Sequence, residues 1–369
     1  MNVYQLVKPL LFGLPAETAH DAVHAGMRVA QGTPIADALR KRYTIADDRL
    51  RVEAFGNEFP NPVGVAAGFD KNAQVPSLLA SLGFGHVEVG GVTADPQSGN
   101  ARPRMFRLRE DEGIVNRMGL NNHGADVVGK RLAAADVDVP VGVNLAKTEH
   151  VAIDDAPEDY RYTYQRVADG GPASESSGTS PDGRSSGGGD FFVVNVSCPN
   201  SEGFRDLQNR DSMEAILTTL QDAGASPLLV KLSPDLPDSA VEDALDLVNE
   251  LGLDGVIATN TTTDRPATLR SHNRAEEGGL SGKPIEPRAT RMVRFVAERV
   301  DVPVVGVGGV FTAEDAYRKL RAGAHVVQLY TGLVYRGPSI ARDINRGLLD
   351  LLDRDGFDSV EDAIGADLE

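Results

Sequence analysis

Cysteine is almost missing from this chain, because Cys198 is the only one among 369 residues. A lone cysteine excludes a disulfide within the chain, a cysteine-rich zinc site and an iron–sulfur cluster held by this chain alone. Long apolar runs are missing as well: none approaches the ~18–20 residues of a transmembrane helix, and the first residues do not resemble a signal peptide. We therefore expect a soluble or peripheral intracellular protein.

Positive charge is also scarce. The chain has 37 basic against 54 acidic residues, a net charge of −17, and only eight of the basic residues are lysines. This balance argues against nucleic acid as a partner, because binding to phosphates needs a basic patch. The excess of acid has two interpretations: an ordinary solvated acidic surface, or adaptation to high salt, where abundant cations screen the self-repulsion.

The first 30 residues predict two helices separated by Gly13 and Pro15. Apolar residues of the first helix recur at helical spacing and form one stripe: Val3, Leu6, Val7, Leu10, Leu11 and Leu14. Either these helices cap the main core, or they form a small module for membrane-surface binding or ligand access, because so much apolar surface is hard to bury between two short helices. We assign residues 1–45 to this helical module and residues 46–369 to a second unit.

The second unit alternates strands and helices. It opens with a predicted hairpin at 51–59, turning at Gly56-Asn57, and helical periodicity marks 239–251 and 313–322. Eight short apolar runs predict buried strands at 63–67, 87–92, 141–145, 191–196, 228–232, 256–259, 304–307 and 326–330. Such an α/β pattern indicates a (β/α)8 TIM barrel or a doubly wound sheet, and the number eight favours the barrel. The Gly- and Ser-rich stretch 169–190 predicts a disordered surface insertion, with a functional lid as the alternative.

The active site of a (β/α)8 barrel lies at the carboxyl ends of its strands. Amides and lysines dominate these positions here, and neither a metal-ligand cluster nor a Ser-His-Asp arrangement is present, so we expect no metal. A ring of amides suits a planar ligand with alternating donors and acceptors, such as a flavin or a pyrimidine. Glycines at 306–309 and Gly282 fit the phosphate site of such barrels, although tight turns explain them equally well.

Seven motifs occur in order along the chain: AAGFDKN (66–72), PRMFRL (103–108), NRMGLNN (116–122), NVSCPN (195–200), ATNTT (258–262), GGLSGKP (278–284) and GVGG (306–309). With them, essentially the whole chain resembles the dihydroorotate dehydrogenase family. The N-terminal helices and the hairpin resemble its membrane-associated, quinone-reducing branch (class 2). The resemblance implies oxidation of (S)-dihydroorotate to orotate in pyrimidine (UMP) biosynthesis, with FMN as hydride acceptor and a quinone as final acceptor. It also implies a peripheral location on the cytoplasmic side of the cell membrane.

The resemblance implies a role for individual residues of this sequence, at the positions that match the family's motifs. The family's FMN contacts fall on Ala67, Gly68, Phe69, Asp70, Lys71, Gly91, Asn144, Asn195, Lys231, Thr259, Gly282, Gly309, Tyr330 and Thr331. Its dihydroorotate contacts fall on Lys71, Asn116, Arg117, Met118, Gly119, Leu120, Asn195, Asn200, Asn260 and Thr261. Lys71 is suited to pair with the substrate carboxylate, and Lys231 to place positive charge near the flavin edge that becomes anionic on reduction. Gly91 departs from the family, whose members often have a hydroxyl residue there.

Cys198 takes the family position of the base that removes the C5 proton. Serine is usual there in the quinone-reducing branch and cysteine in the soluble branch, so Cys198 departs from the branch that the N-terminal helices resemble. A thiol, with a reference pKa of about 8.5, ionises more easily than a hydroxyl. The alternatives are a structural cysteine, a soluble family member using fumarate or (through a separate iron–sulfur subunit) NAD, and a non-catalytic phosphate-ligand or pyrimidine-binding barrel.

Three residues correspond to positions near the quinone tunnel of class 2: His20, Arg107 and Tyr330. A lone histidine on a helix often faces solvent instead. Because the ligands of the barrel lie elsewhere in the sequence, we expect removal of residues 1–40 to spare FMN binding and flavin reduction by dihydroorotate, and to impair membrane association and quinone reduction.

Overall fold

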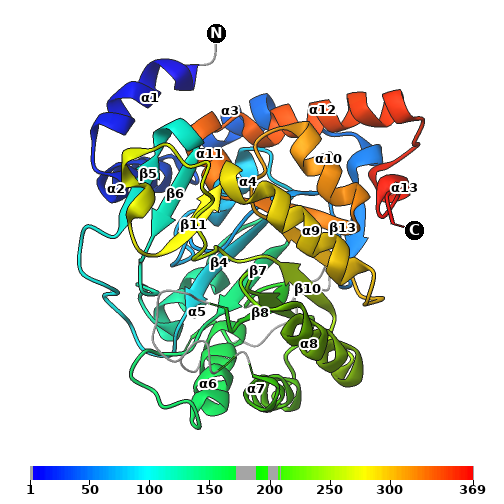
Figure 1. Ribbon diagram of the computed structural model, residues 1–369. Helices are drawn as coiled ribbons and strands as arrows, with labels where there is room; N and C mark the ends of the chain where they lie inside the picture. Colours follow the sequence, from blue (N-terminus) through cyan, green and yellow to red (C-terminus); the bar gives the residue numbers. More distant parts are fainter. Residues whose placement is uncertain (1–2, 172–187, 198–206, 208, 369) are drawn as a thin grey trace.

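A closed barrel of eight parallel strands forms the centre of the molecule in the computed structural model, which describes residues 3–171, 188–197, 207 and 209–368 (Figure 1). The strands are β3 (Val63–Val65), β4 (His86–Val92), β7 (Val141–Leu145), β8 (Phe191–Asn195), β9 (Leu228–Leu232), β10 (Gly255–Ala258), β12 (Val304–Val307) and β13 (Ala324–Leu329). Each barrel strand pairs with the next along the chain, and β13 closes the ring on β3. The predicted TIM barrel is thereby confirmed.

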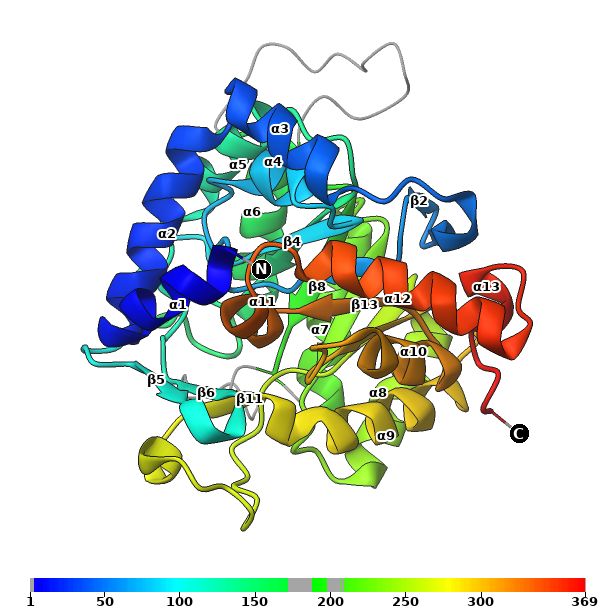
Figure 2. The same ribbon diagram turned by 90° about the horizontal axis from the view of Figure 1, so that it is seen from above.

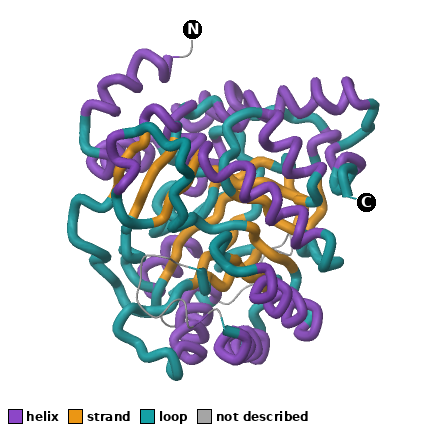
Figure 3. The backbone as a smooth tube through the Cα atoms, viewed as in Figure 1, coloured by secondary structure: helices purple, strands orange, loops and turns teal. Residues whose placement is uncertain are grey.

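Helices surround the strands, which form the inner ring in Figure 3. They are α4 (Pro76–Ser81), α5 (Ala125–Ala133), α6 (Ala156–Ala168), α7 (Arg210–Asp222), α8 (Asp238–Leu251), α9 (Glu286–Ala297), α10 (Ala313–Arg321), α11 (Thr331–Arg336), α12 (Ile340–Asp355) and α13 (Val360–Ala363). Because helices cover the outside and side chains fill the inside, nearly every barrel-strand residue is buried. This double burial explains why the strands appear in the sequence as continuous apolar runs.

The hairpin at the amino-terminal end of the barrel consists of β1 (Val52–Ala54) and β2 (Asn57–Phe59), after a short 3-10 helix at Asp48–Leu50. Its turn lies at Phe55 and Gly56, one residue earlier than predicted, because Ala54 pairs with Asn57. Both turn residues have positive φ, as a type I′ hairpin turn requires. The Phe55 and Phe59 rings contact Phe191 at the start of β8 and so close this end of the barrel.

A three-stranded sheet outside the barrel, called the second sheet below, was not predicted. It joins β5 (Met105–Leu108), β6 (Gly113–Asn116) and β11 (Gly279–Gly282) in the antiparallel order β11-β6-β5. Short 3-10 helices at Arg109–Asp111, His272–Ala275 and Lys283–Ile285 accompany these strands. The sheet brings together segments more than 150 residues apart in sequence, and its residues line the site described below.

Three helices form the N-terminal region: α1 (Val3–Gly13), α2 (Ala16–Ala30) and α3 (Pro34–Tyr43). The first two were predicted. The third was not, although Thr33 caps it and Pro34 opens it. Figure 2 shows α1 and α2 along one side of the barrel.

Most of the predicted apolar stripe of α1 does not pack into the core, although Leu11 packs against a small buried cluster. Leu6 is 61% exposed and Leu10 75%, while Phe12 is buried. On the neighbouring helices, Val29 and Ile35 are exposed too. Among the described residues, no helix is both long and apolar enough to cross a membrane. The insertion predicted at 169–190 lies mostly outside the described part of the chain.

Candidate active site

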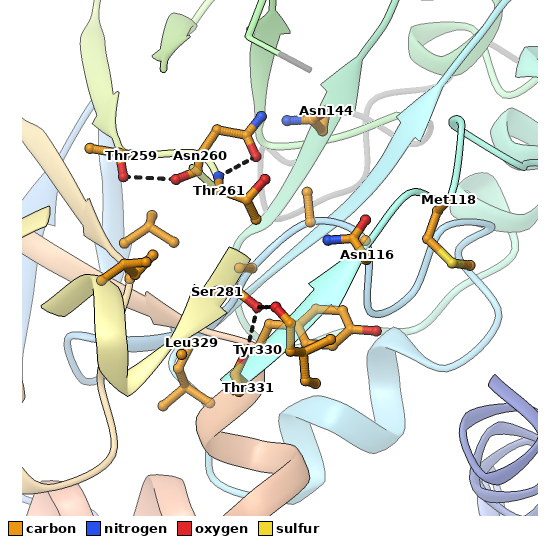
Figure 4. A pocket seen from close by; sticks show the side chains of 18 of the residues that line it. Asn116, Met118, Asn144, Thr259, Asn260, Thr261, Ser281, Leu329, Tyr330 and Thr331 are labelled. Atoms are coloured by element: carbon orange, nitrogen blue, oxygen red, sulfur yellow. Dashed lines mark hydrogen bonds between the residues drawn. The ribbon is translucent and has the colours of Figure 1, made fainter. Parts of the chain in front are cut away.

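A cavity opens at the carboxyl ends of the barrel strands, where the fold predicts an active site. Because amide and lysine side chains stand in its walls, it is called the polar cavity below. Including its open mouth, it encloses about 1160 Å³. Figure 4 shows Asn144, Thr259 and Asn260 from barrel strand ends, and Asn116 and Ser281 from the second sheet, around it. Most of the predicted FMN and substrate residues line the cavity: Ala67, Gly68, Lys71, Gly91, Asn116, Met118, Gly119, Leu120, Asn144, Asn195, Lys231, Thr259, Asn260, Thr261, Gly282, Gly309, Tyr330 and Thr331.

The amides are linked in a chain of hydrogen bonds. Asn195 Nδ2 donates to Asn144 Oδ1 at 3.0 Å, and Asn144 Nδ2 donates to Glu88 Oε1 at 2.7 Å. Asn260 Nδ2 donates to Ser197 Oγ at 3.0 Å. Because neighbouring parallel strands hold these residues at similar heights, each amide is oriented by the next and presents a fixed pattern of donors and acceptors.

Glu88 stands at one end of this row of hydrogen bonds and was not predicted as a site residue. Its carboxylate is fully buried inside the barrel and also accepts from Lys231 Nζ at 3.3 Å. A buried ammonium needs such a partner, because desolvating an unpaired charge costs several kcal/mol or more. The signal in the sequence was an acid in the middle of an apolar strand, HVEVGGV.

Lys71 lies in the turn that follows β3, where its Nζ donates to Gly68 O at 2.6 Å. Burial lowers the pKa of Lys71 to about 8, against the opposing effect of the Glu17 carboxylate. Its neighbour Asp70 is fully buried but does not line the cavity. Instead, the Asp70 carboxylate accepts from the backbone N–H groups of Gln74 and Val75, at 2.9 and 2.7 Å, and so shapes the turn that carries Lys71.

Two other predicted residues also direct their side chains elsewhere. Arg117 Nη1 pairs with Glu276 at 2.9 Å, and its guanidinium stacks over the Phe106 ring, because the loop turns this side chain away from the cavity. Phe69 lines a second cavity. Cys198 and Asn200 lie outside the described residues.

The second cavity is lined mainly by apolar side chains from α1, α2 and the start of α11. It holds all three predicted quinone residues, His20, Arg107 and Tyr330. The His20 ring lies parallel to Tyr330, with centroids 6.4 Å apart, and burial lowers the His20 pKa well below its usual value. Burial also raises the pKa of Tyr330.

The two cavities share Met105, Ile114 and Tyr330 as lining residues. Apart from Tyr330, these shared residues were not predicted, because they come from the second sheet. Across the part of the chain that the structure describes, no three His, Cys, Asp or Glu side chains are grouped to hold a metal ion.

Fold and site together define a (β/α)8-barrel protein with a polar ligand cavity at its strand ends and an apolar cavity beside it. A sequence model of the family described as dihydroorotate dehydrogenase matches residues 49–352. The chain belongs to the dihydroorotate dehydrogenase family.

Its relatives are similar over their full length. The chain is 70% identical to a protein of Haloarcula marismortui and 63% identical to one of Natronomonas pharaonis, each covered completely and each named dihydroorotate dehydrogenase (quinone). It is 36% identical to a ligand-free dihydroorotate dehydrogenase of Eimeria tenella, with a TM-score of 0.85 over 96% of this chain and 99% of the other. The relatives from halophilic genera accord with the high-salt interpretation of the acidic composition.

Proposed function

We propose that FMN carries the electrons in the reaction of this chain, which oxidises (S)-dihydroorotate to orotate in pyrimidine (UMP) biosynthesis with a quinone as final acceptor. The observation that carries the proposal is the meeting of two unlike cavities at Tyr330. One presents amides and buried lysines to a polar planar ligand, and the other presents apolar walls to a hydrophobic one. The polar cavity suits a polar reductant and the apolar cavity a lipid-soluble oxidant, and the two binding sites share part of their lining.

The polar cavity fits FMN. Gly309 lines the cavity with φ +76, and a Cβ there would lie 2.3 Å from Glu286 Cβ, so no side chain fits at this point of the wall. The bare backbone there would lie close to the FMN phosphate. Lys231 and the amides Asn144 and Asn195 would hold the ring. When bound, FMN supplies the acceptor for the hydride that leaves C6 of dihydroorotate.

The protein's own groups bind and deprotonate the substrate. Lys71 pairs with the carboxylate, and Asn116, Asn195 and Asn260 read the N–H and C=O groups of the ring. By family position, Asn200 joins them, and Cys198 takes the C5 proton. Loss of that proton and of the C6 hydride leaves the C5=C6 double bond of orotate.

The N-terminal helices belong to the quinone side of this proposal. Leu6, Leu10, Val29 and Ile35 are exposed on three helices, and other side chains of these helices line the second cavity. We assign residues 1–45 to peripheral attachment to the cytoplasmic face of the membrane, so that a quinone reaches His20 from the lipid.

The test separates the two half-reactions by stopped-flow absorbance. Cys198→Ala should slow bleaching of the flavin band by dihydroorotate about 10²–10⁴-fold, because general-base catalysis contributes that much. Reoxidation of the chemically reduced variant by quinone should stay normal. Cys198→Ser should recover part of the rate with a higher pH optimum. Bleaching of the alanine variant at the wild-type rate would refute the role of Cys198, and faster turnover with fumarate or NAD than with quinone would refute the acceptor.

A further inference from the structure

A buried ion pair connects the N-terminal helices to the substrate side of the barrel. The side chains of Glu17 on α2 and Arg104 just before β5 are 10% and 5% exposed. Arg104 Nη2 and Nε donate to Glu17 Oε1 at 2.8 and 3.1 Å. Such a two-nitrogen contact fixes direction as well as distance, because the guanidinium is planar.

The remaining nitrogen of Arg104 faces a different segment. Arg104 Nη1 donates to the carbonyls of Ser98 and Asn100 at 2.7 and 2.8 Å, and to that of Met118 at 3.4 Å. One guanidinium thus holds the 98–100 turn and the 118 backbone against α2. Gly99 permits this approach, because a Cβ there would lie 2.2 Å from Met118 O.

The backbone held in this way is the wall of the polar cavity. Asn116, Met118, Gly119 and Leu120 all line it. Further bonds tie the same two segments together: Asn100 N donates to Met118 O at 3.1 Å, and Asn100 Nδ2 donates to Arg117 O at 3.0 Å. Arg104 is the member of this set that also reaches the N-terminal helices.

We propose that Glu17 is a positioning residue for dihydroorotate: through Arg104 it holds the 116–120 backbone in the conformation that binds the substrate. The inference rests on the proposed function, which places the substrate against Asn116. It also changes the expectation for the N-terminal helices, since residues 1–40 then serve both half-reactions. Without Glu17, the Arg104 cation stays buried without its carboxylate and is driven to rearrange or to draw in water, which loosens the loop.

The experiment compares Glu17→Gln with Asp21→Asn in the full-length, flavin-loaded protein. Asp21 lies one turn further along α2, is 56% exposed and contacts only Arg102 at 3.5 Å among the ion pairs of the described residues, so its variant removes the same charge from the same helix without touching Arg104. The dissociation constant of orotate is measured from the perturbation of the flavin spectrum. The KM values for dihydroorotate and quinone and the thermal midpoint are measured alongside.

We expect Glu17→Gln to weaken orotate binding about ten- to a hundredfold, the usual effect of losing a charged hydrogen bond, and to raise the KM for dihydroorotate similarly. The KM for quinone should change less than about twofold, as should every constant of Asp21→Asn. Arg104→Lys keeps the positive charge but cannot make the two-nitrogen contact of the guanidinium, so it should weaken orotate binding to a similar extent. This second variant tests the proposal even if Glu17→Gln does not fold.

Equal orotate affinity in Glu17→Gln and the wild type would overturn the inference and leave the ion pair as a brace only. An equal loss in Glu17→Gln and Asp21→Asn would also overturn it, because the cause would then be long-range charge. If the wild-type protein itself bound no orotate, the proposed function would fall and the inference with it.

Discussion

The buried pair of Glu88 and Lys231 offers a sharp test of the site's energetics. Glu88→Gln keeps the shape of the side chain and an acceptor for Asn144, but leaves the Lys231 ammonium without the carboxylate 3.3 Å away. Removing one partner of a buried pair costs about 3–5 kcal/mol. Against a total stability of roughly 5–15 kcal/mol, that loss is large.

A double-mutant cycle separates this cost from packing effects. Lys231→Met leaves the Glu88 carboxylate buried without its ammonium, so it should be destabilising by a similar amount. The double variant Glu88→Gln/Lys231→Met buries no charge and keeps the bond from Asn144. It should therefore lie within about 2 kcal/mol of the wild type, since neutral replacements of buried pairs are often tolerated.

The assay is urea unfolding of the FMN-depleted protein in molar KCl, followed by far-ultraviolet circular dichroism. Removing FMN keeps loss of flavin binding out of the measured free energy of unfolding. Asp353→Asn is the matched control: it breaks a 2.8 Å pair with Arg49 in which the aspartate is 66% exposed, and should cost less than about 1 kcal/mol. If Glu88→Gln cost no more than this control, or the double variant were as unstable as the sum of the singles, the pair would not be coupled as the structure implies.

Other predictions concern protonation and the membrane. Because burial lowers the Lys71 pKa to about 8, the dissociation constant of orotate should be constant below pH 8 and rise about tenfold per pH unit above it. Lys71→Ala should bind orotate about ten- to a hundredfold more weakly, without this change of slope near pH 8. A wild-type dissociation constant that stays constant beyond pH 9 would contradict this. Burial lowers the His86 pKa to about 3, so between pH 6.5 and about 3 only the unfolded chain takes up this proton. Across that window His86 contributes a fall of about 1.4 kcal/mol in the free energy of unfolding for each pH unit of acidification. His86→Phe should therefore show a slope smaller by one proton, and equal slopes would refute the reasoning. Leu6→Gln with Leu10→Gln should weaken sedimentation with lipid vesicles and raise the KM for a long-chain quinone, with the thermal midpoint unchanged; unchanged sedimentation would remove α1 from membrane attachment.

The barrel could be predicted from the sequence because parallel strands are buried on both faces. Each strand therefore appears as an unbroken apolar run, and eight such runs separated by helical segments leave few architectures. The position of the site followed from the same reasoning, since Asn144, Asn195, Lys231 and Thr259 all stand at strand ends. The family motifs then supplied site residues that lie outside the barrel strands, such as Asn116 and Gly282 of the second sheet.

Neighbouring positions in a motif did not reveal where each side chain points. Lys71 faces the cavity, while Asp70 next to it binds backbone N–H groups and Phe69 lines the other cavity. Arg117 turns outward although Asn116 and Met118 line the site. The direction of a loop side chain depends on the local backbone angles and on the groups it contacts. Periodicity in the sequence predicts neither the angles nor the contacts.

Long-range pairing was decided by the tertiary structure alone. The strands β5, β6 and β11 are four residues each, and β11 pairs with β6 across more than 150 residues of sequence, so this pairing leaves no local signal. Glu17 and Arg104 are 87 positions apart, and each resembles a surface charge until the fold buries them together. Helical spacing showed that Leu6 and Leu10 share a face of α1. Only the packing of α1 beside the barrel decided that this face is exposed, because periodicity groups side chains without specifying what they meet.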